Sequence, residues 1–166
     1  MDIKTIKVGY LQTNCYILTK DDECLIIDPG DEFSKINKEL KGKKIAGCYV
    51  THFHFDHIGA LEEIIGKYDL EINKCSSKKF KFEIIQTPGH TRDSISLYFK
   101  KEKIMFCGDF IFEGAIGRTD LGGSIKAMQD SLQMITSYDD DITLYPGHGN
   151  PTKLGTEKDN FSNYYQ

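Results

Sequence analysis

The stretch that decides the fold is a short run rich in histidine, His52-Phe53-His54-Phe55-Asp56-His57. The chain has five histidines in 166 residues, and three of them fall in this run. With this composition, chance would assemble the pattern with a probability on the order of one in a few thousand. A single histidine would be read as a structural residue, but the set with Asp56 predicts ligands of a metal ion.

The other two histidines stand in matching contexts. His90 ends the sequence Thr87-Pro88-Gly89-His90, and His148 ends Tyr145-Pro146-Gly147-His148. Each follows a strand-like run, so the loops at strand ends can bring these ligands together. Zinc and iron accept imidazole nitrogen and carboxylate oxygen, and a hydrolytic site keeps one position open for water. The glycines beside these ligands allow the backbone to approach closely.

Asp109 follows an apolar run, Ile104 to Gly108, where a lone charged group would be costly to bury. A cap of a helix or turn is one reading, and a carboxylate shared by two cations is the reading we prefer. The sequence therefore predicts seven metal ligands: His52, His54, Asp56, His57, His90, Asp109 and His148.

The rest of the chain alternates strand-like and helical patterns. Expected strands are Ile3–Gly9, Asn14–Thr19, Cys24–Asp28, Ile45–Thr51, Phe82–Thr87, Ile95–Phe99, Lys103–Cys107 and Ile142–Tyr145. Expected helices are Glu32–Leu40, His57–Tyr68 and Ser124–Ser137, the last with Ser124 as N-cap. This order suggests an α/β protein with two sheets packed face to face and helices outside. The length of 166 residues fits one domain, residues 1–166.

Composition excludes several classes of function. The net charge of −4 argues against a nucleic-acid-binding protein, and no segment is apolar enough to span a membrane, so no membrane partner is expected. Five cysteines form no CxxC motif and lie mostly in apolar runs, which predicts reduced thiols and a cytoplasmic protein. The lysine clusters beside turns are interpreted as solvated loop charge.

The sequence resembles the metallo-β-lactamase superfamily, and within it the glyoxalase II-like (hydroxyacylglutathione hydrolase-like) metallohydrolases. The matching segments are Thr13–Tyr16, Ile27–Gly30, the histidine run, Thr87–Thr91, Gly108-Asp109, Gly117–Leu121 and Pro146–Gly149. The resemblance implies a four-layer αββα sandwich. It also implies that His52, His54 and His90 bind a first metal. Asp56, His57 and His148 would bind a second, with Asp109 bridging both.

This resemblance predicts an enzyme with two divalent metal ions, zinc in the first place and iron or manganese as alternatives. A hydroxide that bridges the metals would attack a thioester or ester, and Asp56 would hold one metal and orient that hydroxide. A thioester suits the site because a thiolate, whose conjugate acid has a pKa of about 8.5, leaves without an obvious general acid. The expected partner is a small-molecule substrate. The oligomeric state is open.

Two departures leave the substrate open. The larger glyoxalase II enzymes carry a C-terminal domain that binds glutathione, whereas this chain ends soon after His148. The segment between Tyr68 and His90 is also shorter than expected for relatives. Alternatives of the same fold are a persulfide dioxygenase with one iron and an ester or phosphodiester hydrolase, including a nuclease. A regulatory metal-binding protein without turnover is a further alternative, which the complete ligand set disfavours.

Three further residues have two readings each. Arg118 is interpreted as an organiser of its loop that pairs with Asp120, or else as a direct substrate contact. Asp28 is interpreted either as the partner that orients a ligand histidine or as a turn-forming residue before Pro29. Cys107 is expected to pack in the core rather than to bind metal.

Overall fold

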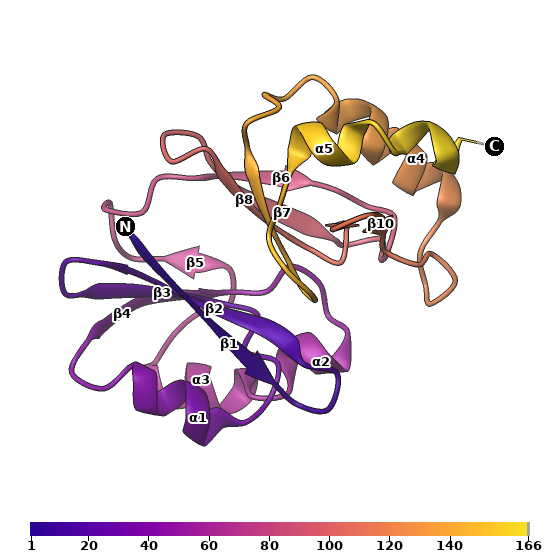
Figure 1. Cartoon of the computed structure of the whole chain (residues 1–166). Helices are drawn as coiled ribbons and strands as arrows, with labels where there is room; N and C mark the ends of the chain where they lie inside the picture. The colour runs from indigo at the N-terminus through magenta and orange to yellow at the C-terminus, as the bar shows by residue number, and fades with distance from the viewer. Residues whose placement is uncertain (166) are drawn as a thin grey trace. The chain divides into compact units, whose positions relative to one another are not determined.

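The computed structural model describes residues 1–165, which form two compact units, Met1–Lys81 and the part from Phe82 onward (Figure 1). No helix among residues 1–165 has the length and apolar character needed to cross a membrane. Each unit is built on one five-stranded mixed sheet with helices on a face of that sheet.

The first unit has the strand order β1-β2-β3-β4-β5. Its strands are β1 (Asp2–Val8), β2 (Thr13–Lys20), β3 (Glu23–Ile27), β4 (Lys44–Tyr49) and β5 (Lys74–Cys75). Its helices are α1 (Phe33–Glu39), α2 (Phe55–Ile58) and α3 (Leu61–Tyr68). Strands β3 and β4 pair in parallel, whereas the other neighbours pair antiparallel. Figure 1 shows α1 and α3 together on one face of the sheet, where Ile36 and Ile64 are fully buried.

The second unit has the strand order β12-β11-β8-β7-β6. Its strands are β6 (Glu83–Gln86), β7 (Ile95–Phe99), β8 (Ile104–Gly108), β11 (Thr143–Pro146) and β12 (Thr152–Lys153), with a separate pair β9 (Ile111–Phe112) and β10 (Ala115–Ile116). Its helices are α4 (Ile125–Ile135), α5 (Leu154–Lys158) and a 3-10 helix (Phe161–Tyr164). Met128 and Leu132 of α4 pack with Leu154 of α5 in one apolar cluster on this sheet.

The central strands of both sheets are buried on both faces, as β3 of the first sheet and β7 and β8 of the second show. On β2, Cys15 and Ile17 belong to the cluster beneath the helices, whereas the alternate residues Tyr16 and Leu18 are also buried. Successive side chains of a strand point to opposite faces, so a strand buried on both faces appears as a continuous apolar run. This explains why the runs at β3, β7 and β8 were recognised in the sequence.

One predicted helix is corrected. We expected a single helix from His57 to Tyr68, but the structure has α2 and α3 separated at Gly59 and Ala60. The break follows from a close approach of two backbones, because a Cβ on Gly59 would lie 2.2 Å from the carbonyl oxygen of Gly30. The amide of Ala60 donates a hydrogen bond of 2.9 Å to the carbonyl of Pro29 instead of continuing the helix.

Candidate metal centre

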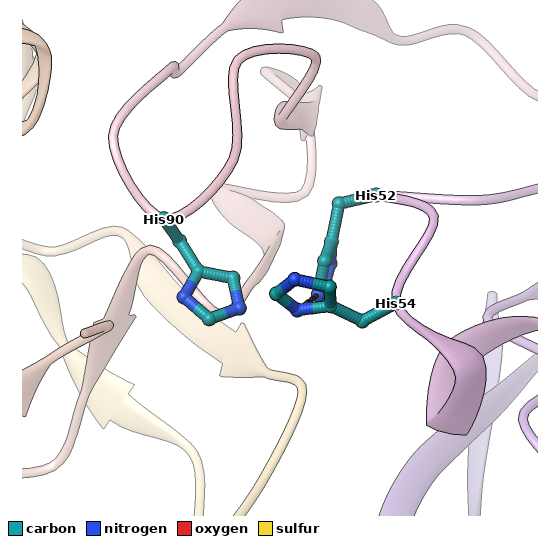
Figure 2. Close-up of side chains that lie close together, drawn as sticks. All are labelled: His52, His54 and His90. Carbon is teal, nitrogen blue, oxygen red and sulfur yellow. Dashed lines mark hydrogen bonds between the residues drawn. The ribbon is translucent and has the colours of Figure 1, made fainter. Parts of the chain in front are cut away.

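The first two predicted ligands lie on the loop between β4 and α2. His52 is buried, and His54 is the residue that precedes the first turn of α2. The Nε2 atom of His52 and the Nδ1 atom of His54 are 3.2 Å apart, and their rings meet edge to face (Figure 2). Two nitrogens bound to one zinc ion at about 2.0–2.1 Å in tetrahedral geometry lie about 3.3–3.4 Å apart. The observed spacing therefore fits two ligands of one ion.

The next two predicted ligands lie on α2 itself. His57 is fully buried, and its Nε2 atom is 3.5 Å from Oδ2 of Asp56. The hydroxyl of Thr13, at the start of β2, donates a hydrogen bond of 2.8 Å to the same Asp56 oxygen. This bond holds the Asp56 side chain in one orientation. Asp56 and His57 are thus a second pair of predicted ligands, with nearly the same spacing as the first pair.

Asp28, directly after β3, contacts His57 and reaches His52 through Thr51, and both histidines are predicted ligands. Its Oδ2 atom lies 2.9 Å from Nδ1 of His57 and accepts a bond of 2.7 Å from the hydroxyl of Thr51. Its Oδ1 atom accepts from the backbone amide of Thr51 at 2.7 Å. The Thr51 hydroxyl donates its one proton to Asp28, so its oxygen accepts a hydrogen bond from Nδ1 of His52 at 3.2 Å. Both histidines then keep the Nε2 lone pair for a metal.

The backbone around Asp28 has a turn geometry as well. Asp28 has a φ of +53°, and its amide donates to the carbonyl of Tyr49. A Cβ on Gly30 would lie 1.8 Å from the backbone oxygen of Asp56. The Asp28-Pro29-Gly30 segment therefore packs directly against α2. Both readings of Asp28 hold, because it forms the turn and also holds the histidine.

The three predicted ligands of the second unit come from strand ends at one edge of its sheet. Asp109 follows β8 and His148 follows β11, and these strands run parallel. His90 lies on the loop after β6, whose direction matches that of β8 because β7 is antiparallel to both. The carboxyl ends of the three strands therefore meet at the same edge.

A single carboxylate oxygen is shared between the two histidines of this unit. Oδ2 of Asp109 lies 3.5 Å from Nε2 of His90 and 3.5 Å from Nε2 of His148. The Nδ1 atom of His90 donates a short bond of 2.6 Å to the backbone carbonyl of Arg118, which leaves its Nε2 atom for a metal. This oxygen therefore lies at the same distance from two candidate metal-binding nitrogens.

Arg118 organises the loop beside this cluster. Its guanidinium makes a bidentate pair with Asp120, with both nitrogen–oxygen distances 2.6 Å, and this pairing lowers the pKa of Asp120 to about 2. The pair is solvent-exposed, so the predicted pairing is found. The role of the Arg118 carbonyl in holding His90 was not predicted. A Cβ on Gly117 would lie 1.8 Å from the backbone oxygen of Asp109, so this loop packs closely against the Asp109 backbone.

The cysteines are packed as the sequence predicted. Cys107 is buried in the apolar cluster under α4, and its thiol lies 3.3 Å from the carbonyl of Ile111. Burial raises the pKa of the Cys15 and Cys48 thiols, which keeps them protonated and unreactive. All five cysteines are free.

The donors present fit a divalent metal of borderline softness. All seven predicted ligands are among the described side chains that could hold a metal ion. Five imidazoles and two carboxylates, with no thiolate, suit zinc or iron better than calcium or magnesium. Neighbouring donor atoms within each unit lie 3.2–3.5 Å apart, as ligands of a common ion do. These features define the class of α/β proteins with a histidine- and aspartate-based metal centre.

The chain belongs to the metallo-β-lactamase superfamily. The model of that family, described as "Metallo-beta-lactamase superfamily", matches residues 8–82 and 76–148. The two matches overlap at residues 76–82, within the segment between Tyr68 and His90. The predicted α/β fold, that of the metallo-β-lactamases, is confirmed by this match and by the similarity to solved structures.

Two curated relatives cover almost the whole chain. A protein named "Probable metallo-hydrolase YqgX" from Bacillus subtilis (strain 168) is 32% identical, and the alignment covers 96% of this chain and 95% of the relative. A protein named "Hydroxyacylglutathione hydrolase GloC" from Haemophilus influenzae is 28% identical, over 95% of each chain. The alignment with the Bacillus protein has 201 positions against 166 residues here, so at least 35 positions face a gap in this chain.

Two solved structures have the same fold over nearly their whole length. The structure of "BLEG-1 B3 metallo-beta-lactamase" superposes with a TM-score of 0.88 at 28% identity and covers 95% of this chain and 97% of that one. The structure of "TTHA1623 in a di-iron-bound form" gives a TM-score of 0.83 at 27% identity, over 93% and 96% of the two chains.

Proposed function

We propose that this protein is a metal-dependent hydrolase with a dinuclear centre, and that it acts on a small-molecule thioester. The observation that carries the proposal is the shared position of Asp109, whose Oδ2 atom is equally distant from His90 and His148. One carboxylate between two imidazoles is what a bridging ligand requires. Under this proposal the two units act together as one hydrolase domain, residues 1–166.

The predicted ligands can be divided between two ions. His52, His54, His90 and Asp109 would hold the first ion. Asp56, His57, His148 and Asp109 would hold the second. Each ion would then have four protein ligands, with Asp109 counted for both, and four ligands are typical of zinc.

Two bound metal ions would supply a hydroxide nucleophile at neutral pH and would polarise the carbonyl of the substrate. Residues around the predicted ligands would fix the ligand side chains in the orientations that metal binding needs. Asp28 and Thr51 fix the tautomers of His57 and His52, and Thr13 fixes Asp56, which we propose as the catalytic carboxylate that orients the nucleophile. A thiolate leaving group departs without a proton donor near neutral pH.

The choice of a thioester rests on relatives. GloC and several further relatives of 27–36% identity are named hydroxyacylglutathione hydrolase. Zinc is our first proposal for the metal because imidazole dominates the ligand set, with manganese as an alternative. Iron is also an alternative, and one similar structure is of a di-iron form. The five free cysteines, four of them buried, support our proposal of a location in the cytoplasm.

The test is turnover of thioesters by protein loaded with zinc or iron. We expect release of free thiol from S-lactoylglutathione or from another acyl-thioester, and loss of this activity when a chelator removes the metal. Consumption of oxygen on a glutathione persulfide by a protein with one iron would instead support the dioxygenase alternative. Hydrolysis of phosphodiesters without thioester turnover would place the enzyme in a different reaction class.

A further inference from the structure

A cavity opens beside the candidate ligand Asp56, wholly within the first unit. Its volume is about 360 Å³. The residues that line it come from the turn between β1 and β2, from the turn after β3 and from α2: Gly9, Tyr10, Leu11, Gly30, Asp31, Phe55, Asp56 and Gly59. We name this cavity the hairpin pocket.

Three large apolar side chains of the hairpin pocket are exposed to solvent. Tyr10 is 96% exposed, Leu11 46% and Phe55 74%. Large apolar groups gathered on one surface beside a reactive centre are typical of a ligand-binding site. They account for three of the ten large hydrophobic residues that are exposed among residues 1–165. The rim of the pocket can therefore bury an apolar group.

The turn that carries Tyr10 and Leu11 is held in a defined conformation. The amide of Gln12 donates to the carbonyl of Gly9 at 3.2 Å, and the Gln12 side chain donates to the same carbonyl at 2.9 Å. The amide of Gly9 donates to the carboxylate of Glu32 at 3.0 Å, which ties the turn to the start of α1. A pre-formed rim binds an apolar group without a large ordering cost.

The charge of the hairpin pocket is negative. Asp31 and Asp56 are the charged residues among those that line it, and none of the lining residues is a lysine or an arginine. Under the proposed function Asp56 is committed to a metal, so Asp31 is the one charged lining residue that is not a proposed metal ligand. A carboxylate at this position repels anionic ligands and tolerates neutral or cationic ones.

We propose that the hairpin pocket binds the apolar acyl chain of a neutral or cationic thioester and disfavours thioesters of glutathione, which carries two carboxylates. This inference rests on the proposed function, because it places the acyl chain beside a metal ligand. It adds the substrate class: an apolar acyl group on a thiol without negative charge.

The first experiment measures kcat/KM for N-acetylcysteamine thioesters of increasing acyl length, from acetyl to hexanoyl. Full burial of one methylene is worth about 0.8 kcal/mol, or about fourfold, so we expect a rise of at least about tenfold across the series. Leu11→Ser should reduce this rise to less than about threefold. Ile84→Ser is the matched control, because Ile84 on β6 is also 46% exposed but lies outside the pocket. A flat series in the wild-type protein would overturn the inference.

The second experiment tests the role of charge. A unit charge about 8 Å away in water changes the affinity for a monovalent ion about twofold. Asp31→Asn should therefore raise kcat/KM for hexanoylglutathione about twofold, and Asp31→Lys about fivefold, with both gains shrinking as salt is added. The neutral N-acetylcysteamine thioester should show no such gain. Equal effects on both substrates would overturn the assignment of Asp31.

A binding measurement separates this inference from the proposed function. Metal-free protein labelled with nitrogen-15 is titrated with hexanoyl-N-acetylcysteamine, and amide shifts are recorded. We expect shifts at Tyr10, Leu11 and Phe55 in the wild-type protein and their loss in Leu11→Ser. Such shifts without thioester turnover by the metal-loaded protein would contradict the proposed function but would support binding of the acyl chain in the hairpin pocket. Thioester turnover without these shifts would contradict binding in the hairpin pocket but would support the proposed function.

Discussion

Replacement of Asp28 by asparagine tests how the ligand histidines are oriented. The Asp28 carboxylate is buried and takes part in three hydrogen bonds, with the Thr51 amide, the Thr51 hydroxyl and Nδ1 of His57. The amide nitrogen of an asparagine would face His57 with a donor where an acceptor is needed. His57 would then favour the tautomer with its proton on Nε2, which is the atom a metal requires.

The size of the effect follows from these contacts. Changes at the partner of a ligand histidine typically cost about 10–100-fold in metal affinity, which corresponds to about 1.4–2.7 kcal/mol. We expect this loss at the ion held by Asp56 and His57. The ion held by His52 should lose less, because the Thr51 hydroxyl can accept from the asparagine amide and still accept from Nδ1 of His52. The metal-free protein should lose about 2 kcal/mol of unfolding free energy with the charge-assisted bonds.

The assay is a stepwise titration of zinc into metal-free protein in competition with a chelator of known affinity. Asp22→Asn is the control, because Asp22 is an exposed carboxylate of the same unit that pairs with Lys79. We expect two binding steps in the wild-type protein and in the control, with one step displaced about 10–100-fold in Asp28→Asn. Two unchanged steps in Asp28→Asn would refute the reasoning about tautomers.

Four further predictions concern packing and charge. Gly30→Ala should lower the free energy of unfolding by about 3 kcal/mol, because its Cβ would lie 1.8 Å from a backbone oxygen of α2. Gly66→Ala, in α3 with open space around it, should raise that free energy by about 1 kcal/mol, and chemical denaturation measures both. Cys107→Ala should keep full metal content by elemental analysis while losing about 1 kcal/mol of stability, and loss of metal would count against its packing role. The pair with Arg118 lowers the pKa of Asp120 to about 2, so its contribution to folding stability is complete above about pH 4 and is lost as the pH falls through about 2. Titration of the Asp120 carboxyl by NMR measures this pKa, and a midpoint near 3.8 would contradict the pairing.

The candidate ligands could be picked out from the sequence because it offers few alternatives, and their metal binding stays a prediction. Every histidine lies in a motif at the end of a strand-like run, and Asp109 follows an apolar strand where a charge needs a partner. The long strands were also predictable, since residues buried on both faces make continuous apolar runs. Ser124 was recognised as the N-cap of α4, and its hydroxyl does accept a bond from Ala127.

Other features carry no local signal. The break between α2 and α3 depends on the approach of Gly30 to Gly59, which are far apart in the sequence. The carbonyl of Arg118 that holds His90 is a backbone group, so no side-chain type marks it. Thr13 could be recognised only as part of a segment that resembles the family and not as the partner of Asp56. Strands β5, β9, β10 and β12 have two residues each, which is too short for any periodicity.

The proposed dinuclear centre, bridged by Asp109, is tested most directly by the number of metal ions bound per chain. Protein purified without chelators and analysed for metal by mass spectrometry should contain about two divalent ions per chain. His148→Ala should retain about one ion, and Asp109→Ala should bind both only weakly. Asp93→Ala, a change of a carboxylate elsewhere in the second unit, should keep two. A wild-type content of one ion, or two tightly bound ions in Asp109→Ala, would contradict the account.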